Sequence, residues 1–178
     1  MRKLIFAFIG PSGCGKTSII EALLEKYGHR LSFVKTVTTR PPRSPKEHAL
    51  YTFVSTMEFM DLLADKRLLQ NGKAFYAENW YDNDRADIDT IFAAGKIGIC
   101  ALLENSIATF REAGYEVVTI RVRPIGGHDG RTEARRIADE ERERNGPTPD
   151  AVIENDFSDP HGLVRAVNGA EAIVRRYA

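Results

Sequence analysis

Residues 3–17 read KLIFAFIGPSGCGKT, and this stretch decides the fold. The first seven residues are apolar and rich in Ile and Phe, which is typical of a strand buried within a sheet. The next eight, GPSGCGKT, match the pattern G-x-x-x-x-G-K-[ST]. The segment TSIIEALLEKYG that follows carries one apolar stripe, which predicts a helix that stops near Gly28. The N-terminus therefore predicts a strand, a glycine loop and a helix in succession.

The glycine loop predicts a phosphate-binding site. Glycines let the backbone curl until its N–H groups point inward, and the N-terminus of the next helix adds positive potential. In this pattern the lysine reaches the β- and γ-phosphates of ATP, and the final hydroxyl binds Mg²⁺. The alternative is a glycine-rich turn that binds nothing, but the strand and helix around the loop favour the phosphate site. The predicted ATP-binding residues are Gly10, Ser12, Gly13, Gly15, Lys16, Thr17 and Ser18, with Thr17 also the metal ligand.

The composition is that of an ordinary globular protein. The chain has 178 residues, which is most often one domain, and its 25 basic and 25 acidic residues cancel. The net charge therefore indicates neither a nucleic-acid nor a membrane partner. The apolar run LIFAFI is too short for a signal peptide or a membrane span, and Cys14 and Cys100 lack metal-ligand spacing. We expect a cytoplasmic protein with reduced cysteines.

Strands and helices alternate along the rest of the chain. Further strands are predicted at 31–39, 51–55, 74–81, 97–103, 115–122 and 151–156. Helices are predicted at 56–69 with Thr56 as N-cap, at 82–95, at 104–114 and from about residue 159 onward. The highly charged segment 125–149 has a helical middle. This alternation predicts an α/β fold with a mainly parallel sheet.

The stretch TVTTRPPR, residues 36–43, is a candidate for a second anion site. Arg40 and Arg43 lie three residues apart in a proline-stiffened loop, so their side chains can converge on one anion. A planar guanidinium suits phosphate because it donates two hydrogen bonds at once. The composition alone favours the alternative, a solvated loop whose charges serve solubility.

The order of these motifs closely resembles that of the guanylate kinase family. GPSGCGKTS is followed by TVTTRPPR and then by YTFVS with a downstream EF; further similarities are Tyr81, the arginine-rich helix around Arg135 and Arg136, and the late pair Asn155 and Asp156. The resemblance is strong over residues 5–59 and weak between 70 and 150. It implies a P-loop NTPase-type parallel sheet flanked by helices, with a small nucleoside-monophosphate-binding subdomain and a helical lid.

The resemblance also implies how one domain, residues 1–178, is divided. Residues 1–35, 85–124 and 150–178 would form the core, 36–84 the nucleoside-monophosphate-binding subdomain, and 125–149 the lid. The implied reaction is phosphoryl transfer from ATP, with Mg²⁺, to a nucleoside monophosphate, by default GMP or dGMP. The acceptor phosphate already carries the attacking oxygen, so the protein has only to position the substrates and neutralise their charge.

The resemblance assigns roles to particular residues of this chain. Arg40, Arg43, Tyr51 and Tyr81 would hold the acceptor phosphate, and Thr36, Gln70 and Asn83 would face the base. Lys16 and Arg136 would stabilise the transition state, with Arg135 and Arg131 as alternatives to Arg136. The lid helix could instead be an exposed charged helix whose Glu–Arg pairs need no ligand.

Three departures from the family pattern bear on the acceptor. Gln70 stands where the family has the glutamate that reads guanine, and Ala101 and Leu103 stand where it has aspartates. Glu104 follows one residue later and could substitute for a lost aspartate or simply begin a helix. The segment that leads into the lid is also short. An amide offers one donor and one acceptor, which suits adenine, hypoxanthine or uracil better than the two adjacent donors of guanine.

Three other functions therefore stay open at this point. The acceptor could carry another base, as in AMP, IMP, UMP or a deoxynucleoside monophosphate. It could be a phosphoribosyl small molecule, since related kinases share the loop and the fold. The chain could also be a non-catalytic guanylate-kinase-like binding module, although such modules have degraded P-loops and this one is intact. The oligomeric state is not indicated by the sequence.

Overall fold

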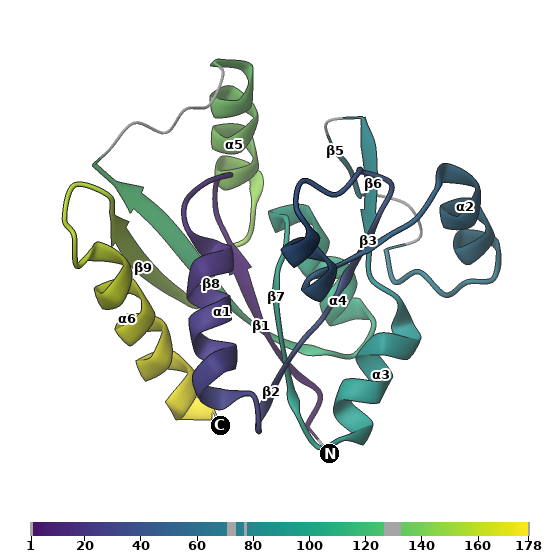
Figure 1. Ribbon diagram of the computed structural model, residues 1–178, viewed down its shortest axis with the longest axis horizontal. Coiled ribbons are helices and arrows are strands. Elements are labelled where there is room, and N and C mark those ends of the chain that lie inside the picture. The colour runs from purple at the N-terminus through teal and green to yellow at the C-terminus, as the bar shows by residue number, and fades with distance from the viewer. Residues whose placement is uncertain (1, 71–73, 77, 127–132, 178) are drawn as a thin grey trace.

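Five parallel strands form the main sheet of the computed structural model, which describes residues 2–70, 74–76, 78–126 and 133–177. Their order is β2-β7-β1-β8-β9 (Figure 1). The bounds are β1 (Leu4–Ile9), β2 (Leu31–Phe33), β7 (Ile97–Ala101), β8 (Glu116–Ile125) and β9 (Ala151–Asp156). In the centre, Phe6 of β1 is aligned with Ile99 of β7 and Val118 of β8. The predicted α/β fold with a mainly parallel sheet is confirmed.

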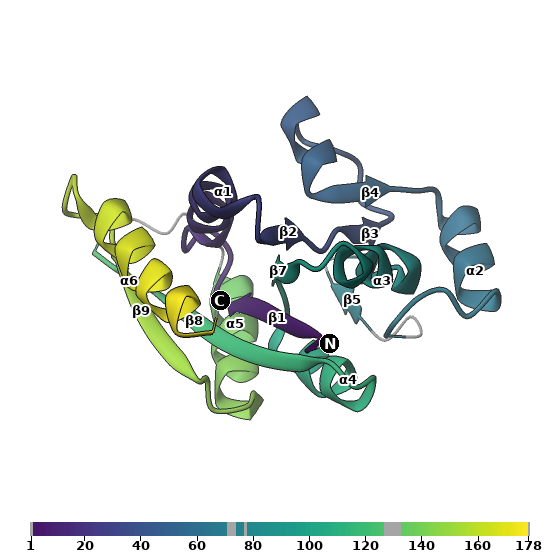
Figure 2. The same cartoon turned by 90° about the horizontal axis from the view of Figure 1, so that it is seen from below.

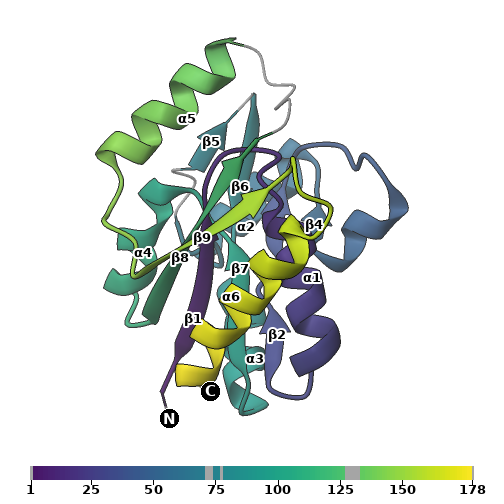
Figure 3. The ribbon, with the colours of Figure 1, turned by 90° about the vertical axis from the view of Figure 1, so that its left-hand side faces the viewer.

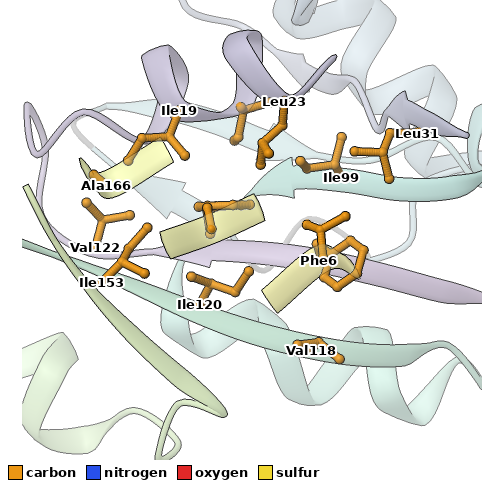
Figure 4. Packing of buried hydrophobic residues seen from close by; sticks show 14 of the residues in the cluster. Phe6, Ile19, Leu23, Leu31, Ile99, Val118, Ile120, Val122, Ile153 and Ala166 are labelled. Carbon is orange, nitrogen blue, oxygen red and sulfur yellow. The ribbon is translucent and has the colours of Figure 1, made fainter. Parts of the chain in front are cut away.

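Helices cover both faces of this sheet (Figures 1 and 2). The helices α1 (Lys16–Tyr27) and α6 (Gly162–Tyr177) lie on one face, and α3 (Arg85–Ala93) and α4 (Ile107–Glu112) on the other. The alternation of side chains along β1 explains both cores. Leu4, Phe6 and Phe8 belong to the α1–α6 side, drawn in Figure 4, and the residues between them to the α3–α4 side. The whole strand is buried, as its apolar composition predicts.

A second, four-stranded sheet lies beside the main one, with the order β4-β3-β6-β5. Its elements are β3 (Thr36–Thr38), η1 (Pro45–Ala49), β4 (Tyr51–Phe53), α2 (Thr56–Ala64), β5 (Ala74–Tyr76) and β6 (Asn79–Asp82). It has a small core of its own, formed by Val37, Phe59 and Leu68 with Trp80 packed against it. The predicted strand 31–39 is thus two strands in two different sheets, because its halves pair with β7 and with β4 and β6.

The helix α5 (Glu133–Asn145) stands above the carboxyl ends of the main strands (Figures 1 and 3). This edge is where open α/β sheets bind their ligands. Between β7 and α4 the chain forms one 3₁₀ turn, η2 (Glu104–Ser106). Within the described ranges, no helix is both long and apolar enough to cross a membrane.

Several element boundaries differ from those predicted. The N-cap of α2 is Ser55 rather than Thr56, because Ser55 and Glu58 form a reciprocal capping box. The same helix ends at Ala64 rather than near residue 69, and Lys66 then adopts a left-handed conformation with φ of 58°. The predicted strand 74–81 is an antiparallel hairpin of β5 and β6. Cys14 and Cys100 are buried and form no disulfide, and burial raises the pKa of the Cys100 thiol.

Candidate active site

The glycine loop joins the end of the central strand β1 to the start of α1. Gly15 is the N-cap of the helix and has a φ of 95°, a left-handed conformation that side chains rarely adopt. A Cβ atom on Gly15 would also lie 2.3 Å from Nδ2 of Asn155. That Nδ2 donates a hydrogen bond to the carbonyl oxygen of Cys14 at 3.0 Å. The last turn of the loop is therefore held by a buried side chain of β9.

We expect Gly15→Ala to abolish ATP binding, because the new methyl group must displace Asn155 as well as strain the backbone. Gly95→Ala is the matched control, since Gly95 also has a positive φ, 71°, but nothing lies within 4 Å of its Cβ position. The control should lower the free energy of unfolding by about 1–2 kcal/mol, the cost of the left-handed conformation alone. Calorimetric titration of ATP and thermal unfolding of both variants measure the difference. Unchanged ATP affinity in Gly15→Ala would contradict the role given to this contact.

Lys16 folds back over the loop. Its ammonium donates to the carbonyl oxygens of Gly10 at 2.7 Å and Pro11 at 2.8 Å, and lies 3.6 Å from the sulfur of Cys14. These contacts match the three N–H donors of an ammonium group. Phosphate oxygens that enter the loop would take the place of the carbonyl oxygens as stronger, charged acceptors. Thr17 and Ser18 lie exposed in the first turn of α1.

The proline-rich loop holds a second cluster of cationic and aromatic groups. Arg40 is 8% exposed, and its guanidinium pairs with both carboxylate oxygens of Glu47, at 3.0 and 3.3 Å. The same guanidinium lies over the ring of Tyr51, 5.1 Å from the centroid. Glu47 also accepts the backbone N–H of Arg43 at 2.6 Å. Sequence reasoning missed Glu47, although its position four residues after Arg43 was a usable signal.

Charge and burial act differently on two titratable groups of this cluster. The hydrogen bond from Arg40 holds the pKa of the Glu47 carboxyl below its usual value, with a further contribution from the Arg43 N–H. Glu47 is therefore an anion at neutral pH and keeps the buried guanidinium charged and oriented. Burial raises the pKa of the Tyr51 phenol, so its hydroxyl stays protonated and can donate to a phosphate oxygen.

One cleft of about 650 Å³ joins the glycine loop to the arginine cluster. It brings together all the predicted ATP-binding, acceptor-phosphate and base-facing residues: Gly10, Ser12, Gly13, Gly15, Lys16, Thr17, Ser18, Thr36, Arg40, Arg43, Tyr51, Gln70, Tyr81 and Asn83. These residues come from the glycine loop, the first turn of α1, the second sheet and the loops beside that sheet. The structure thus places two cation sets on one cavity, which is the arrangement that two polyanionic substrates require.

Residues beside the second sheet and at the end of β7 form the part of the cleft that is predicted to face the base. The Asp82 carboxylate accepts the backbone N–H of Gln70 at 2.8 Å and of Asn83 at 2.7 Å, which ties these two residues together. Ala101 and Leu103, at the positions of the family aspartates, also line the cleft.

Two features of this chain decide the family that it belongs to. They are the complete loop pattern at the end of β1 and the match of the chain to a family model. That model, described as guanylate kinase, matches residues 1–170.

The chain belongs to the guanylate kinase family. Its relatives include the guanylate kinase of Synechocystis sp., 27% identical in an alignment that covers 94% of each chain. The guanylate kinases of Mycoplasmopsis synoviae and Sphingopyxis alaskensis are 28% and 32% identical over 69% of this chain. Those two alignments span 65% and 56% of the relatives' own length.

A solved structure of the family has the same fold. The crystal structure of guanylate kinase from Anaplasma phagocytophilum superimposes with a TM-score of 0.75 and covers 98% of this chain and 86% of its own. The two sequences are 22% identical in that superposition, so the likeness supports the P-loop architecture.

The arginines predicted to act from a lid do not line the main cleft in the described part of the chain. Arg136 lines a second cavity of about 300 Å³, bordered by Gly10, Pro11 and the end of β8, and not the main cleft. The side chain of Arg135 and the whole of Arg131 lie outside the described part of the chain. Arg142, which sequence reasoning missed, lines both the second cavity and the main cleft. It forms ion pairs with Asp139 and, at 3.8 Å, with the buried Glu104.

Glu104 starts η2 and lines the second cavity, so it does not replace the missing aspartates in the main cleft. The signal for Arg142 in the sequence was weak. It lies three residues after Asp139 in a helix where charged pairs of this spacing are common, so the spacing alone does not separate it from its neighbours.

The residues present fit a magnesium ion that arrives with the nucleotide. Among the described residues, no group of three His, Cys, Asp or Glu side chains could hold a metal ion. Thr17 offers its hydroxyl to the cleft, and Glu21, one helical turn later, lines the same cavity. Mg²⁺ keeps several waters and is usually bound by one or two protein groups together with substrate phosphates. This donor set matches that pattern.

Proposed function

We propose that the chain transfers the γ-phosphoryl group of ATP to GMP or dGMP, giving ADP and the nucleoside diphosphate. One observation carries the proposal: Lys16 of the glycine loop and the arginine pair Arg40 and Arg43 line a single cleft. Family membership supports it, and the curated relatives are named guanylate kinase. The intact loop argues against a non-catalytic binding module, and the matches favour none of the other acceptors.

The chain's own residues would carry the reaction by position and charge. The glycine loop and the N-terminus of α1 would hold the ATP phosphates, with Lys16 on the β- and γ-oxygens. Arg40, Arg43, Tyr51 and Tyr81 would hold the acceptor phosphate so that one of its oxygens lies in line with the γ-phosphorus. Bound Mg²⁺, held by Thr17, would neutralise charge between the β- and γ-phosphates.

We further propose that the second sheet moves with the acceptor and that α5 acts as a lid. Residues 36–84 hold the acceptor cluster and have a core of their own, which is what a semi-independent subdomain requires. The helix α5 lies above the carboxyl ends of the main strands, and its Arg142 lines the cleft. Arg136 stays a predicted transition-state group that would reach the cleft only after the lid has moved.

A coupled assay of ADP release, with ATP, Mg²⁺ and a panel of acceptors, tests the function. The panel contains the common ribo- and deoxyribonucleoside monophosphates, IMP and ribose phosphates. Turnover with GMP or dGMP is expected. Turnover only with ribose phosphates would replace this proposal by a sugar-phosphate kinase, and ATP binding without any turnover would favour the binding module.

A further inference from the structure

The base-facing end of the cleft is built from neutral amides. Gln70 is 5% exposed and Asn83 is 1% exposed, and both line the cleft together with the hydroxyl-bearing Thr36. Two carboxylates, Glu47 and Glu21, are among the described residues that line the cleft, and neither belongs to this end of it. Glu47 forms an ion pair with Arg40, and Glu21 lies exposed on α1. A base in this part of the cleft would therefore meet amide groups and no anion.

Asn83 presents a fixed hydrogen-bond acceptor. Its Nδ2 donates to the carbonyl oxygen of Lys35 at 2.8 Å, and its backbone N–H is held by Asp82. The reverse orientation of the amide would place two oxygens against each other, so the orientation is determined by this contact. Oδ1 is the atom that remains to accept a hydrogen bond from a ligand.

Gln70 presents an amide that can turn. Its backbone is fixed by Asp82, but within the described residues its side-chain amide has no hydrogen-bond partner. In the described part of the chain, Arg121 Nε is the only side-chain polar atom that is both sealed from solvent and without a hydrogen-bond partner. The Gln70 amide also has no partner there, so it is not sealed from solvent, and it opens to the cleft that Gln70 lines. An amide carries a donor beside an acceptor, and rotation by half a turn exchanges the two.

We propose that Gln70 and Asn83 read the purine base as a neutral pair, so that guanine is preferred over hypoxanthine and adenine by only one hydrogen bond. The proposal rests on the nucleoside monophosphate kinase activity proposed above. The Gln70 amide pairs with O6 and N1–H of guanine or hypoxanthine, or after rotation with N1 and the 6-amino group of adenine. Asn83 Oδ1 accepts from the 2-amino group, which guanine alone of the three carries.

The energetic consequence is a broad acceptor range. Leaving one neutral acceptor unpaired lowers kcat/KM by about 10- to 100-fold. We therefore expect GMP to be the best acceptor, and IMP and AMP to be phosphorylated with kcat/KM about 10- to 100-fold lower. A charged reader would discriminate more strongly, because a carboxylate forms stronger hydrogen bonds with donors and is penalised more when it is left without them.

Two variants test the pair by their kcat/KM values for GMP, IMP and AMP. Gln70→Glu should lower kcat/KM for GMP and IMP at least tenfold, because a carboxylate puts an oxygen in place of the amide donor that faces O6. Asn83→Ala should reduce the GMP-to-IMP ratio toward one. Asn105→Asp is the matched control, since Asn105 is an exposed residue of η2 that does not line the cleft, and it adds the same charge nearby.

Binding of GMP, IMP and AMP in the absence of ATP, measured by calorimetry, separates the two proposals. If the monophosphates bind with affinities in these ratios but none is phosphorylated, the amide pair stands and the kinase activity fails. If GMP is phosphorylated but wild type rejects IMP and AMP by more than about a thousandfold, and Gln70→Glu leaves kcat/KM for GMP unchanged, the activity stands and the amide pair is overturned. The Asn83→Ala outcome is a ratio within one variant, so partial loss of stability does not affect it, and comparison with Asn105→Asp corrects the Gln70→Glu outcome for the added charge.

Discussion

The variant Lys16→Ala is expected to lose at least a thousandfold in kcat/KM while it remains folded. The ammonium is the side-chain cation of the glycine loop, where charge develops on the transferring group. Removing one preorganised donor from such a site costs about 10²–10³ in rate, and removing a full charge next to phosphates costs more. Among the described residues, the ammonium makes its hydrogen bonds to loop atoms, two carbonyl oxygens and one sulfur. The expected change in Tm is therefore within about 2–4 °C.

The measurement is the initial rate of ADP release with saturating GMP and varied ATP, together with thermal unfolding. Lys3→Ala is the control for loss of one positive charge, because Lys3 precedes β1 at the opposite end of the strand and has an exposed, long contact with Asp89 at 3.4 Å. The control should keep its full turnover. Turnover near the wild-type rate in Lys16→Ala would overturn the assignment of the glycine loop.

Arg43→Ala is expected to raise the KM for the acceptor about 10- to 100-fold. The KM for ATP should change by no more than about twofold. A charge-assisted hydrogen bond to phosphate is worth about 1.5–3 kcal/mol, which corresponds to this range. Arg43 is the better probe of the cluster because its side chain is exposed. Arg40 is buried against Glu47 and Tyr51, so its removal would also leave a carboxylate without its partner.

Steady-state kinetics with each substrate varied in turn give both KM values. Arg30→Ala serves as the control, since Arg30 is an exposed arginine in the turn before β2, away from the residues that line the cleft. Equal increases in both KM values would count against two separate phosphate sites in one cleft, and so would unchanged values.

The sequence by itself determined those parts of the protein that depend on residues close together in the chain. The strand, loop and helix of residues 3–28 follow from local apolar periodicity and from glycines, and all three are present in the structure. The arginine pair of residues 40 and 43 lies in one short loop, so sequence proximity alone brings it together. The alternation of strands and helices predicted a mainly parallel sheet, and β1, β7, β8 and β9 lie in one.

Only the tertiary structure decided which distant residues meet. Asn155 holds the carbonyl of Cys14 across 141 positions of sequence, and Lys35 fixes the amide of Asn83 across 48. Arg136 lines only the second cavity, whereas Arg142, which pairs with Glu104, lines the main cleft as well, because successive side chains of α5 are rotated by about 100° and its docking decides where each one lies. Side-chain periodicity indicates which residues share a face of a helix or strand. Which other element packs against that face depends on the tertiary structure, and no local pattern in the sequence encodes it.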